Sequence, residues 1–326
     1  MYLPDLKFSL WADFIERDYL DGEFKELIDK KIINGATSNP SIFKSAFLTS
    51  NAYKKQLSSL KDCSAKEKYE ALAIYDIQKA ADVLKPLYLS GDDGYVSIEV
   101  DPFLCDDADA TIKEAKRLYS AISRENVMIK IPATPAGYKA MEVLSGLGIA
   151  INATLIFSQD QALACANAFK NGAKTTSKVA ATVISVFVSR IDRAMDAELI
   201  AHGITPALTG IYNSARIYST IEEMKVPQCR TLFASTGVKD DNLPADYYID
   251  GLLGFNCINT APIDTIKAFD KNGKKIQTLP IDAKIIDEHF MQIKNSGIDF
   301  DAVIDKQIND GLEAFKEAFQ EIMETL

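Results

Sequence analysis

The sequence is poor in the residues that build metal sites and disulfide frameworks. It contains two histidines, His202 and His289, and five widely spaced cysteines with no C-x-x-C pair. A Cys/His zinc site is therefore not expected, and the cysteines are interpreted as small buried hydrophobic residues of a protein in a reducing compartment. Because histidine is so scarce, acid–base chemistry would have to fall to carboxylates, lysine, tyrosine or water.

Long apolar runs and an excess of basic charge are also missing. No stretch approaches the roughly 18 consecutive apolar residues of a membrane span, and the opening MYLPDLKFSLWADF lacks the features of a secretory signal. The formal net charge of −10 argues against a nucleic-acid-binding surface but is compatible with a local pocket for an anion. We therefore expect a cytoplasmic protein that binds neither membranes nor nucleic acids.

The sequence does contain short, β-branched apolar runs that alternate with amphipathic helical patterns, which is typical of βαβ units around a parallel sheet. The candidate strands span residues 7–13, 32–39, 95–101, 127–133, 149–157, 180–188, 229–236 and 254–262. The helical patterns between them include residues 66–85, 106–122, 158–170, 190–201 and 209–224. Such a series predicts an α/β fold, a (β/α)8 TIM barrel. A doubly wound sheet is the alternative, and it is disfavoured because no G-x-G-x-x-G motif follows the first strand.

Two segments are longer than a plain barrel requires. Residues 40–94, after the second strand, should form two or more extra helices. The C-terminal residues, about 283–326, have helical periodicity and are expected to pack as helices on the barrel. No low-complexity linker or internal repeat is present, so residues 1–326 are predicted to form one barrel domain.

Polar residues share faces on several predicted strands. Successive residues of a strand point to opposite sides, so Lys130 points away from its apolar neighbours Ile129 and Ile131 and into the barrel. The same test groups further residues at the interior, namely Asp13, Thr37, Asn39, Glu99, Asn152, Thr154, Ser185 and Phe187. A barrel interior is normally apolar, and catalytic residues come from the C-terminal ends of several strands. The polar set therefore predicts an active site.

A lysine inside a barrel indicates covalent chemistry. Burial favours the neutral form of an amine, which can attack a carbonyl and form a Schiff base. The protonated imine withdraws electrons, so that a C–C bond beside it can break while a carboxylate takes the hydroxyl proton. Asp13 and Glu99 are candidates for this proton transfer, directly or through a water held by Thr154. Taken singly, these residues also allow a structural interpretation, in which Lys130 and Glu99 form a buried ion pair and Asn152 or Thr154 satisfies backbone groups.

The chain resembles the transaldolases, a family of Schiff-base (class I) aldolase-type barrels of the pentose phosphate pathway. The matching segments follow the family order over nearly the whole chain: SLWAD, GATSNPSIF, VSIEVDP, VMIKIPAT, INATLIFS, VISVFVSRIDR, LFASTGVK and NTAP. The resemblance implies that sugar phosphates are the substrates and that no metal or organic cofactor is needed. Because relatives are often dimers, it also allows a homodimer.

The resemblance assigns roles to residues that the strand pattern had already grouped. Lys130 would form the Schiff base with the C2 carbonyl of a ketose phosphate, and Asp13 would act as acid and base on the C4 hydroxyl. Glu99 and Thr154 would position a catalytic water. The remaining implied residues would bind the dihydroxyacetone hydroxyls or wall the pocket: Asn39, Asn152, Ser185 and Phe187.

Phosphate recognition is where the sequence departs from the family pattern. Arg190 matches the family arginine that holds the substrate phosphate. A second arginine often stands in an A-S-x-R segment, but this chain has ASTGVK, with Gly237 at the arginine's place. Lys239 would have to reach the phosphate instead, helped by Ser235, although an ordinary solvated loop lysine explains it nearly as well. The segment NGATSNPSIF also lacks the acidic residue of the D-A-T-T-N-P form.

Several functions stay open at this point. The first is transfer of a dihydroxyacetone unit from sedoheptulose 7-phosphate or fructose 6-phosphate to glyceraldehyde 3-phosphate or erythrose 4-phosphate. The second is a fructose 6-phosphate aldolase that releases free dihydroxyacetone. A non-catalytic sugar-phosphate-binding barrel is the third, since fold alone never establishes function. A metal-dependent aldolase is disfavoured by the lack of a ligand cluster. Because it replaces a buried amine with a hydrophobic residue of similar size, Lys130→Met is expected to leave the fold intact or more stable.

Overall fold

The structure is a computed structural model that describes residues 1–240 and 242–326. Its centre is a closed barrel of eight parallel strands in sequential order, with β1 paired to β8. The strands are β1 (Ser9–Ala12), β2 (Gly35–Thr37), β3 (Tyr95–Glu99), β4 (Val127–Pro132), β5 (Ile151–Ile156), β6 (Thr182–Phe187), β7 (Cys229–Ala234) and β8 (Cys257–Ala261). Each lies within a predicted range, and the predicted (β/α)8 barrel is confirmed.

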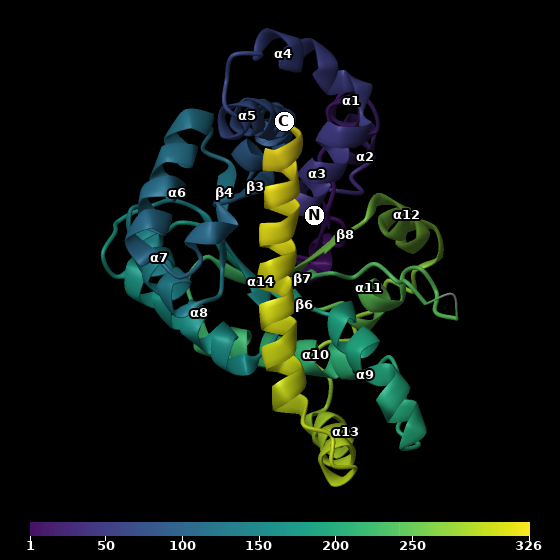
Figure 1. Ribbon diagram of the computed structural model, residues 1–326. Coiled ribbons are helices and arrows are strands. Elements are labelled where there is room, and N and C mark those ends of the chain that lie inside the picture. Colours follow the sequence, from purple (N-terminus) through teal and green to yellow (C-terminus); the bar gives the residue numbers. More distant parts are fainter. Residues whose placement is uncertain (241) are drawn as a thin grey trace.

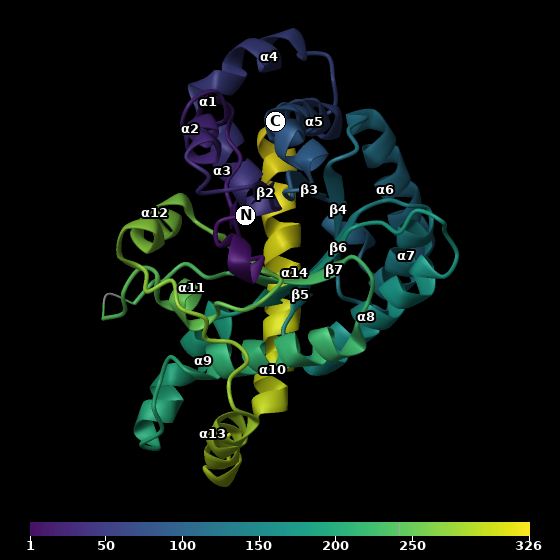
Figure 2. The same ribbon diagram turned by 180° about the vertical axis from the view of Figure 1, so that it is seen from behind.

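Helices surround the barrel and connect its strands (Figures 1 and 2). The helices between β1 and β3 are α1 (Arg17–Asp21), α2 (Glu23–Asp29), α3 (Pro40–Thr49), α4 (Lys54–Ser59) and α5 (Ala65–Ser90). The later connections contain α6 (Ala108–Ile122), α7 (Pro135–Gly146), α8 (Gln159–Ala173), α9 (Ser189–Ala201), α10 (Thr209–Met224), α11 (Tyr247–Gly251) and α12 (Ile263–Asn272). The extra helices predicted after β2 are therefore confirmed as α3, α4 and α5.

Local sequence signals explain where several helices begin. Ser158 and Gln161 form a capping box at the start of α8, in which each side chain accepts a hydrogen bond from the other residue's backbone N–H. Ser64 and Glu67 do the same at the start of α5. These caps accept hydrogen bonds from backbone N–H groups that the first turn of a helix leaves unpaired, and they therefore determine the residue at which each helix begins.

The C-terminal segment forms α13 (Ala283–Asn295) and α14 (Phe300–Thr325), as predicted. Helix α14 runs across the barrel and packs against α3, α5, α9 and β5 (Figure 1). Its buried face includes Ile304, Phe315, Phe319 and Ile322. This helix is the cover of one barrel mouth.

The register of the sheet brings the predicted interior residues side by side. Glu99 of β3 is paired with Lys130 of β4, and Lys130 is paired in turn with Asn152 of β5. One irregularity breaks the alternation in β5, where the register with β6 shifts between Ala153 and Ile156. Leu155 lies within this shift, has a left-handed backbone with φ of +60°, and packs in the interior apolar cluster. The strand pattern did not predict this irregularity.

The cysteines occupy the positions expected of small hydrophobic residues. All five are free thiols, and four of them are buried, namely Cys105, Cys165, Cys229 and Cys257. Among the described residues, none of the helices is both long and apolar enough to span a bilayer.

Candidate active site

A cavity of about 150 Å³ opens at the C-terminal ends of the strands. Eight of the residues predicted from the sequence line it: Asp13, Thr37, Asn39, Lys130, Ser185, Phe187, Arg190 and Ser235. Ser41, Ala234, Thr260 and Phe315 complete the lining. The C-terminal ends of the barrel strands are the usual location of active sites in TIM barrels. The sequence-based grouping of these residues is therefore reproduced in three dimensions.

Lys130 occupies the interior face of β4 and is almost fully buried. Its Nζ lies 3.6 Å from Glu99 Oε2 and donates a hydrogen bond of 3.2 Å to the backbone carbonyl of Ser38. The same Nζ lies 5.6 Å from the ring centre of Phe315. The amine is thus not unpaired, because a carboxyl group shares its site. The buried ion pair that the sequence allowed is present, and it lies inside the cavity wall.

Glu99 is buried with little help from hydrogen bonds. Neither carboxylate oxygen has a hydrogen-bond partner among the described residues. Burial raises the pKa of Glu99 to about 7, although Lys130 opposes the rise. A carboxyl group with a pKa near neutrality can both accept and return a proton at working pH. Glu99 is therefore suited to exchange protons with the amine or with a water beside it.

Asp13 follows the last residue of β1 and faces the same cavity. Thr37 Oγ1 donates a hydrogen bond of 2.7 Å to Asp13 Oδ1, and Thr260 Oγ1 lies 2.7 Å from Thr37 Oγ1. Since the Thr37 proton is used on Asp13, Thr260 donates to Thr37. Burial raises the pKa of Asp13, while the positive charges of Lys130 and Arg190 and the bond from Thr37 act in the opposite direction. The two threonines hold the carboxylate in one orientation.

Asn152 and Ser185 form a hydrogen-bonded row behind the amine. Ser185 Oγ donates to Asn152 Oδ1 at 2.6 Å, and Asn152 Nδ2 donates to Ser97 Oγ at 3.0 Å. Asn152 is fully buried and supports the cavity through Ser185 rather than lining it. Thr154 is also fully buried, and its Oγ1 has no hydrogen-bond partner within the described part of the chain.

Asn39 lines the cavity and also caps a helix. Its Oδ1 accepts a hydrogen bond of 3.0 Å from the backbone N–H of Ile42 and so caps the N-terminus of α3. The Asn39 carboxamide is therefore fixed at the cavity edge.

A cationic end of the cavity is formed by Arg190, in the first turn of α9. Its guanidinium lies 5.1 Å from the ring centre of Phe187, and burial lowers the pKa of Arg190. Ser235 adopts a left-handed backbone with φ of +54°, and its Oγ lies 3.2 Å from Ser189 Oγ. An arginine fork next to two hydroxyl groups matches the donors that a phosphate group requires.

The family follows from comparison with known proteins. Residues 10–326 match the model of the family described as Transaldolase/Fructose-6-phosphate aldolase. The chain belongs to this family. A protein named transaldolase from Campylobacter jejuni subsp. jejuni serotype O:23/36 (strain 81-176) is 46% identical over 98% of this chain and 99% of its own length. One of the same name from Helicobacter pylori (strain P12) is 42% identical, again over 98% and 99%.

The transaldolase/aldolase cavity also contains residues that sequence reasoning did not select. Thr260 near the end of β8 gave no signal in the sequence. Phe315 fits the helical periodicity of α14, and periodicity alone does not reveal that α14 crosses the mouth. Gly311 of the same helix lies so close to the site that a Cβ there would come 3.4 Å from Arg190 Nη1.

Lys239 is the predicted residue whose placement differs most from its expected role. It is exposed and does not line the cavity that contains Lys130 and Arg190. Its contact with a substrate phosphate stays a prediction.

Proposed function

We propose that this chain is a transaldolase that acts through a Schiff base on Lys130. It transfers a dihydroxyacetone unit from sedoheptulose 7-phosphate or fructose 6-phosphate to glyceraldehyde 3-phosphate or erythrose 4-phosphate. The observation that carries the proposal is a buried lysine 3.6 Å from a carboxylate, inside a cavity that also contains Asp13 and Arg190. Family membership and the printed name of its relatives support the same conclusion.

Schiff-base formation is the first step of the proposed reaction. Neutral Lys130 Nζ attacks the C2 carbonyl carbon of the ketose phosphate, and the carbonyl oxygen leaves as water. Glu99 relays the proton that the amine releases to the carbonyl oxygen, because its pKa of about 7 allows it to accept and to return a proton. A second proton, from solvent, completes the departing water and leaves the imine protonated. Thr154, whose hydroxyl is buried on the next strand, helps to hold that water.

Carbon–carbon cleavage follows from the charge on the imine. Asp13 takes the proton from the C4 hydroxyl, the C3–C4 bond breaks, and the carbon chain from C4 onward leaves as an aldose phosphate. The bonding electrons move toward the iminium nitrogen and form an enamine of the three-carbon unit. Thr37 keeps Asp13 oriented toward the scissile bond through its 2.7 Å hydrogen bond.

Transfer reverses these movements with a different aldehyde. C3 of the enamine attacks the carbonyl carbon of the acceptor, Asp13 returns its proton to the new hydroxyl, and water then hydrolyses the Schiff base. Arg190 and Ser235 bind the phosphate of donor and acceptor in turn, and Lys239 adds a point charge near the same end. Asn39 and Ser185 bind hydroxyl groups of the retained unit.

Borohydride trapping tests the Schiff base directly. With fructose 6-phosphate present, borohydride reduces the imine to a stable secondary amine, and peptide mass spectrometry should place the adduct on Lys130. Lys130→Met should give no adduct, while Lys139→Met, which removes an exposed lysine on α7, should behave as wild type. An intact wild-type protein without an adduct would favour the non-catalytic sugar-phosphate-binding barrel.

A product assay distinguishes transferase from aldolase. We expect the heptulose or hexulose phosphate product to require an aldehyde acceptor and little free dihydroxyacetone to appear without one. Rapid release of dihydroxyacetone in the absence of an acceptor would instead identify an aldolase, the other activity in the family's description.

The proposal extends to the organisation of the protein. The chain would act as a single barrel domain in the cytoplasm, with homodimer assembly and without nucleic-acid or membrane partners. Light scattering of the purified protein during size-exclusion chromatography tests the assembly.

A further inference from the structure

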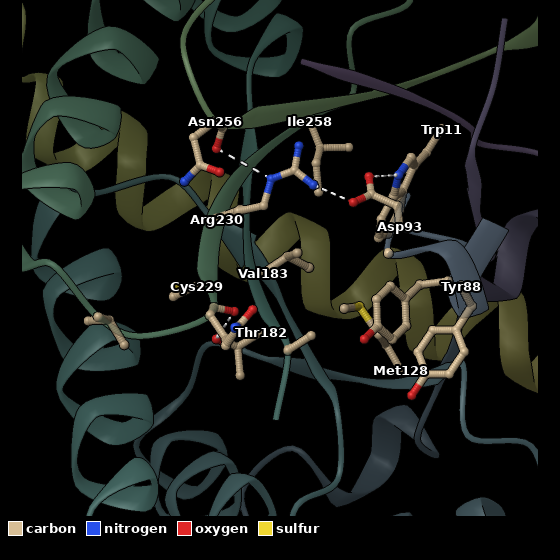
Figure 3. Close-up of a pocket in the computed structure, with 15 residues that line it drawn as sticks. Trp11, Tyr88, Asp93, Met128, Thr182, Val183, Cys229, Arg230, Asn256 and Ile258 are labelled. Carbon is tan, nitrogen blue, oxygen red and sulfur yellow. Dashed lines mark hydrogen bonds and ion pairs between the residues drawn. The ribbon is translucent and has the colours of Figure 1, made fainter. Parts of the chain in front are cut away.

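A second cavity, of about 400 Å³, opens at the opposite end of the barrel (Figure 3). Tyr95, Thr182 and Cys229 line it, and they are the first residues of β3, β6 and β7. The catalytic cavity lies at the other ends of these strands and is smaller, at about 150 Å³. The proposed reaction leaves this larger cavity unused.

One layer of side chains separates the two cavities. Trp11, Met128, Val183 and Ile258 line the second cavity. On each strand, the residue two positions later lines the catalytic cavity, namely Asp13, Lys130, Ser185 and Thr260. Because side chains two residues apart share a strand face, the floor of the second cavity lies directly against the catalytic layer.

Aromatic side chains form one wall of this cavity, and the indole among them is held rigidly. Trp11 Nε1 donates a hydrogen bond of 3.0 Å to Asp93 Oδ2. A Cβ on Gly35 would meet the indole at 2.5 Å, so only glycine lets the ring lie against β2. Tyr95 lies 6.5 Å from Trp11 and 5.3 Å from Tyr88 between ring centres. Tyr88 and Tyr95 are partly exposed and offer apolar ring faces, whereas Trp11 is buried beside them; Figure 3 shows Trp11 and Tyr88.

The part of the wall next to Trp11 is polar but carries no net charge. Arg230 Nη1 donates to Asp93 Oδ1 at 2.6 Å, while Nη2 donates to the carbonyls of Lys7 and Cys257 at 2.9 and 3.0 Å. Asp93 thus neutralises the only arginine among the lining residues. An anionic ligand would have to compete with this carboxylate, whereas a neutral ligand with hydrogen-bonding groups would not.

Three lining residues have a backbone conformation that is uncommon for their type. Asp93, Gln228 and Asn256 have φ of 51°, 56° and 56°. Asparagine and aspartate tolerate this left-handed region, but glutamine adopts it at a cost. Such strain is concentrated at functional sites. The Arg230 network stabilises the wall, but it does not explain why the space beside it is left unfilled.

We propose that this cavity binds a neutral, planar heteroaromatic molecule of about the size of a nucleobase or nucleoside. Its ring faces pack against Tyr88 and Tyr95, close to the buried Trp11, and its polar edge meets the wall that carries Arg230 and Asn256. A volume of about 400 Å³ with mixed apolar and polar lining is within the usual range of small-molecule sites. The assignment does not depend on the reaction proposed for the other end of the barrel.

Trp11 provides a direct readout, because it is the single tryptophan of the chain. Adenine, adenosine and nicotinamide are titrated into the protein while indole fluorescence is followed, and calorimetry gives the stoichiometry. We expect at least one probe to change the fluorescence saturably with one site per chain. Ala181→Leu, which fills the cavity from its rim, should weaken this binding at least about tenfold. Tyr88→Leu should weaken it as well, whereas Tyr75→Leu, on the same helix α5 but outside the cavity, should not.

Two controls place any binding in this cavity. The Ala181→Leu and Tyr88→Leu proteins should keep wild-type turnover, which shows that they fold. Lys130→Met should bind the probe as tightly as wild type, and fructose 6-phosphate should not displace it. The inference is overturned if none of the three probes binds, if folded Ala181→Leu protein binds as well as wild type, or if fructose 6-phosphate competes.

Discussion

Replacing Glu99 with glutamine tests how burial and proton binding are coupled in the site. Burial raises the pKa of Glu99 from its ordinary value of 4.5 to about 7. Between these values the folded protein keeps a proton that the unfolded chain has released. This contribution to stability is complete below 4.5, falls as the pH rises, and is lost once the pH exceeds about 7. Glutamine cannot release a proton, so the variant should not show the loss.

The size of the effect follows from the width of this pH window. Each pH unit within it is worth about 1.4 kcal/mol per proton, so wild type should lose roughly 3 kcal/mol across the window relative to Glu99→Gln. The lost contact with Lys130 adds an offset to the variant's stability. The slope, rather than the offset, reports the burial of the carboxyl group.

Urea unfolding of both proteins at several pH values between about 4.5 and 8 measures this difference. The free energy of unfolding of Glu99→Gln minus that of wild type should rise by roughly 3 kcal/mol from the acidic to the basic end. Glu125→Gln, which changes an exposed carboxylate, should show no such rise. A flat difference for Glu99→Gln would refute the argument that burial keeps this proton on the folded protein.

Turnover should report the same titration. If ionised Glu99 accepts the amine proton, kcat/KM of wild type should rise with pH through about 7, and this limb should be missing from the residual activity of Glu99→Gln. A limb that persists in the variant would assign it to another group.

Four further substitutions test other parts of the site. Asp13→Asn should lower kcat by about two to four orders of magnitude in steady-state assays, since it removes the general acid and base, and an unchanged kcat would exclude that role. Arg190→Lys should raise KM for fructose 6-phosphate at least about tenfold but leave cleavage of an unphosphorylated ketose unchanged, because only the phosphate contact is altered. Gly311→Ala should raise the same KM roughly fivefold with kcat retained, because the new methyl group would come 2.9 Å from Leu155 Cδ2 and force α14, which lies beside Arg190, to move; an unchanged KM would mean that Leu155 adjusts without disturbing Arg190. Lys130→Met should be less stable than wild type by about 3 kcal/mol above neutral pH, because it leaves the Glu99 carboxylate without a partner, and urea unfolding should show this deficit shrinking as the pH falls below about 7 and Glu99 takes up its proton; equal stability at high pH would instead support an unpaired amine.

The barrel was predictable because its signals are local and repeated. Each strand is a short β-branched run, and the period of two along such a run determines which side chains face inward. That period placed Lys130, Glu99, Asn152 and Ser185 in the interior. The sheet register brings the first three together, and a hydrogen bond joins Ser185 to Asn152. The capping box at Ser158 is equally local, so its position was visible without tertiary structure.

Contacts that depend on packing between distant segments were not predictable in this way. Helical periodicity identifies Phe315 as buried, but whether it meets the barrel wall or Lys130 depends on where α14 crosses. Thr260 becomes important only because β8 closes beside β1 and brings its hydroxyl to Thr37. The pairing of Lys130 with Glu99 was considered from the sequence, but its separation had to come from the structure.

The expected role of Lys239 shows the limit of reading a motif one residue at a time. The family pattern gave the lysine a reason to lie near the phosphate, since Gly237 replaces the usual arginine. Lys239 lies two residues after Gly237, so the conformation of the loop after β7 determines where its side chain points. The chemistry of the side chain does not determine that conformation. Ser235 and Arg190 reached the cavity because a strand end and a helix start hold them.

The polar layer around Lys130 also explains the apolar layers on either side of it. Branched apolar side chains normally fill a barrel, and here amines, carboxylates, amides and hydroxyls take that space. Apolar side chains are instead buried on both sides of this layer. Trp11, Met128 and Ile258 lie on the side of the strands' N-terminal ends, and Phe315 of α14 lies on the other side. The left-handed residue Leu155 belongs to the same cluster, and its side chain would touch a Cβ at position 311 at 2.9 Å. Helix α14 is therefore part of the barrel's own core as well as its cover, so access to Lys130 and the stability of the interior depend on the same contacts.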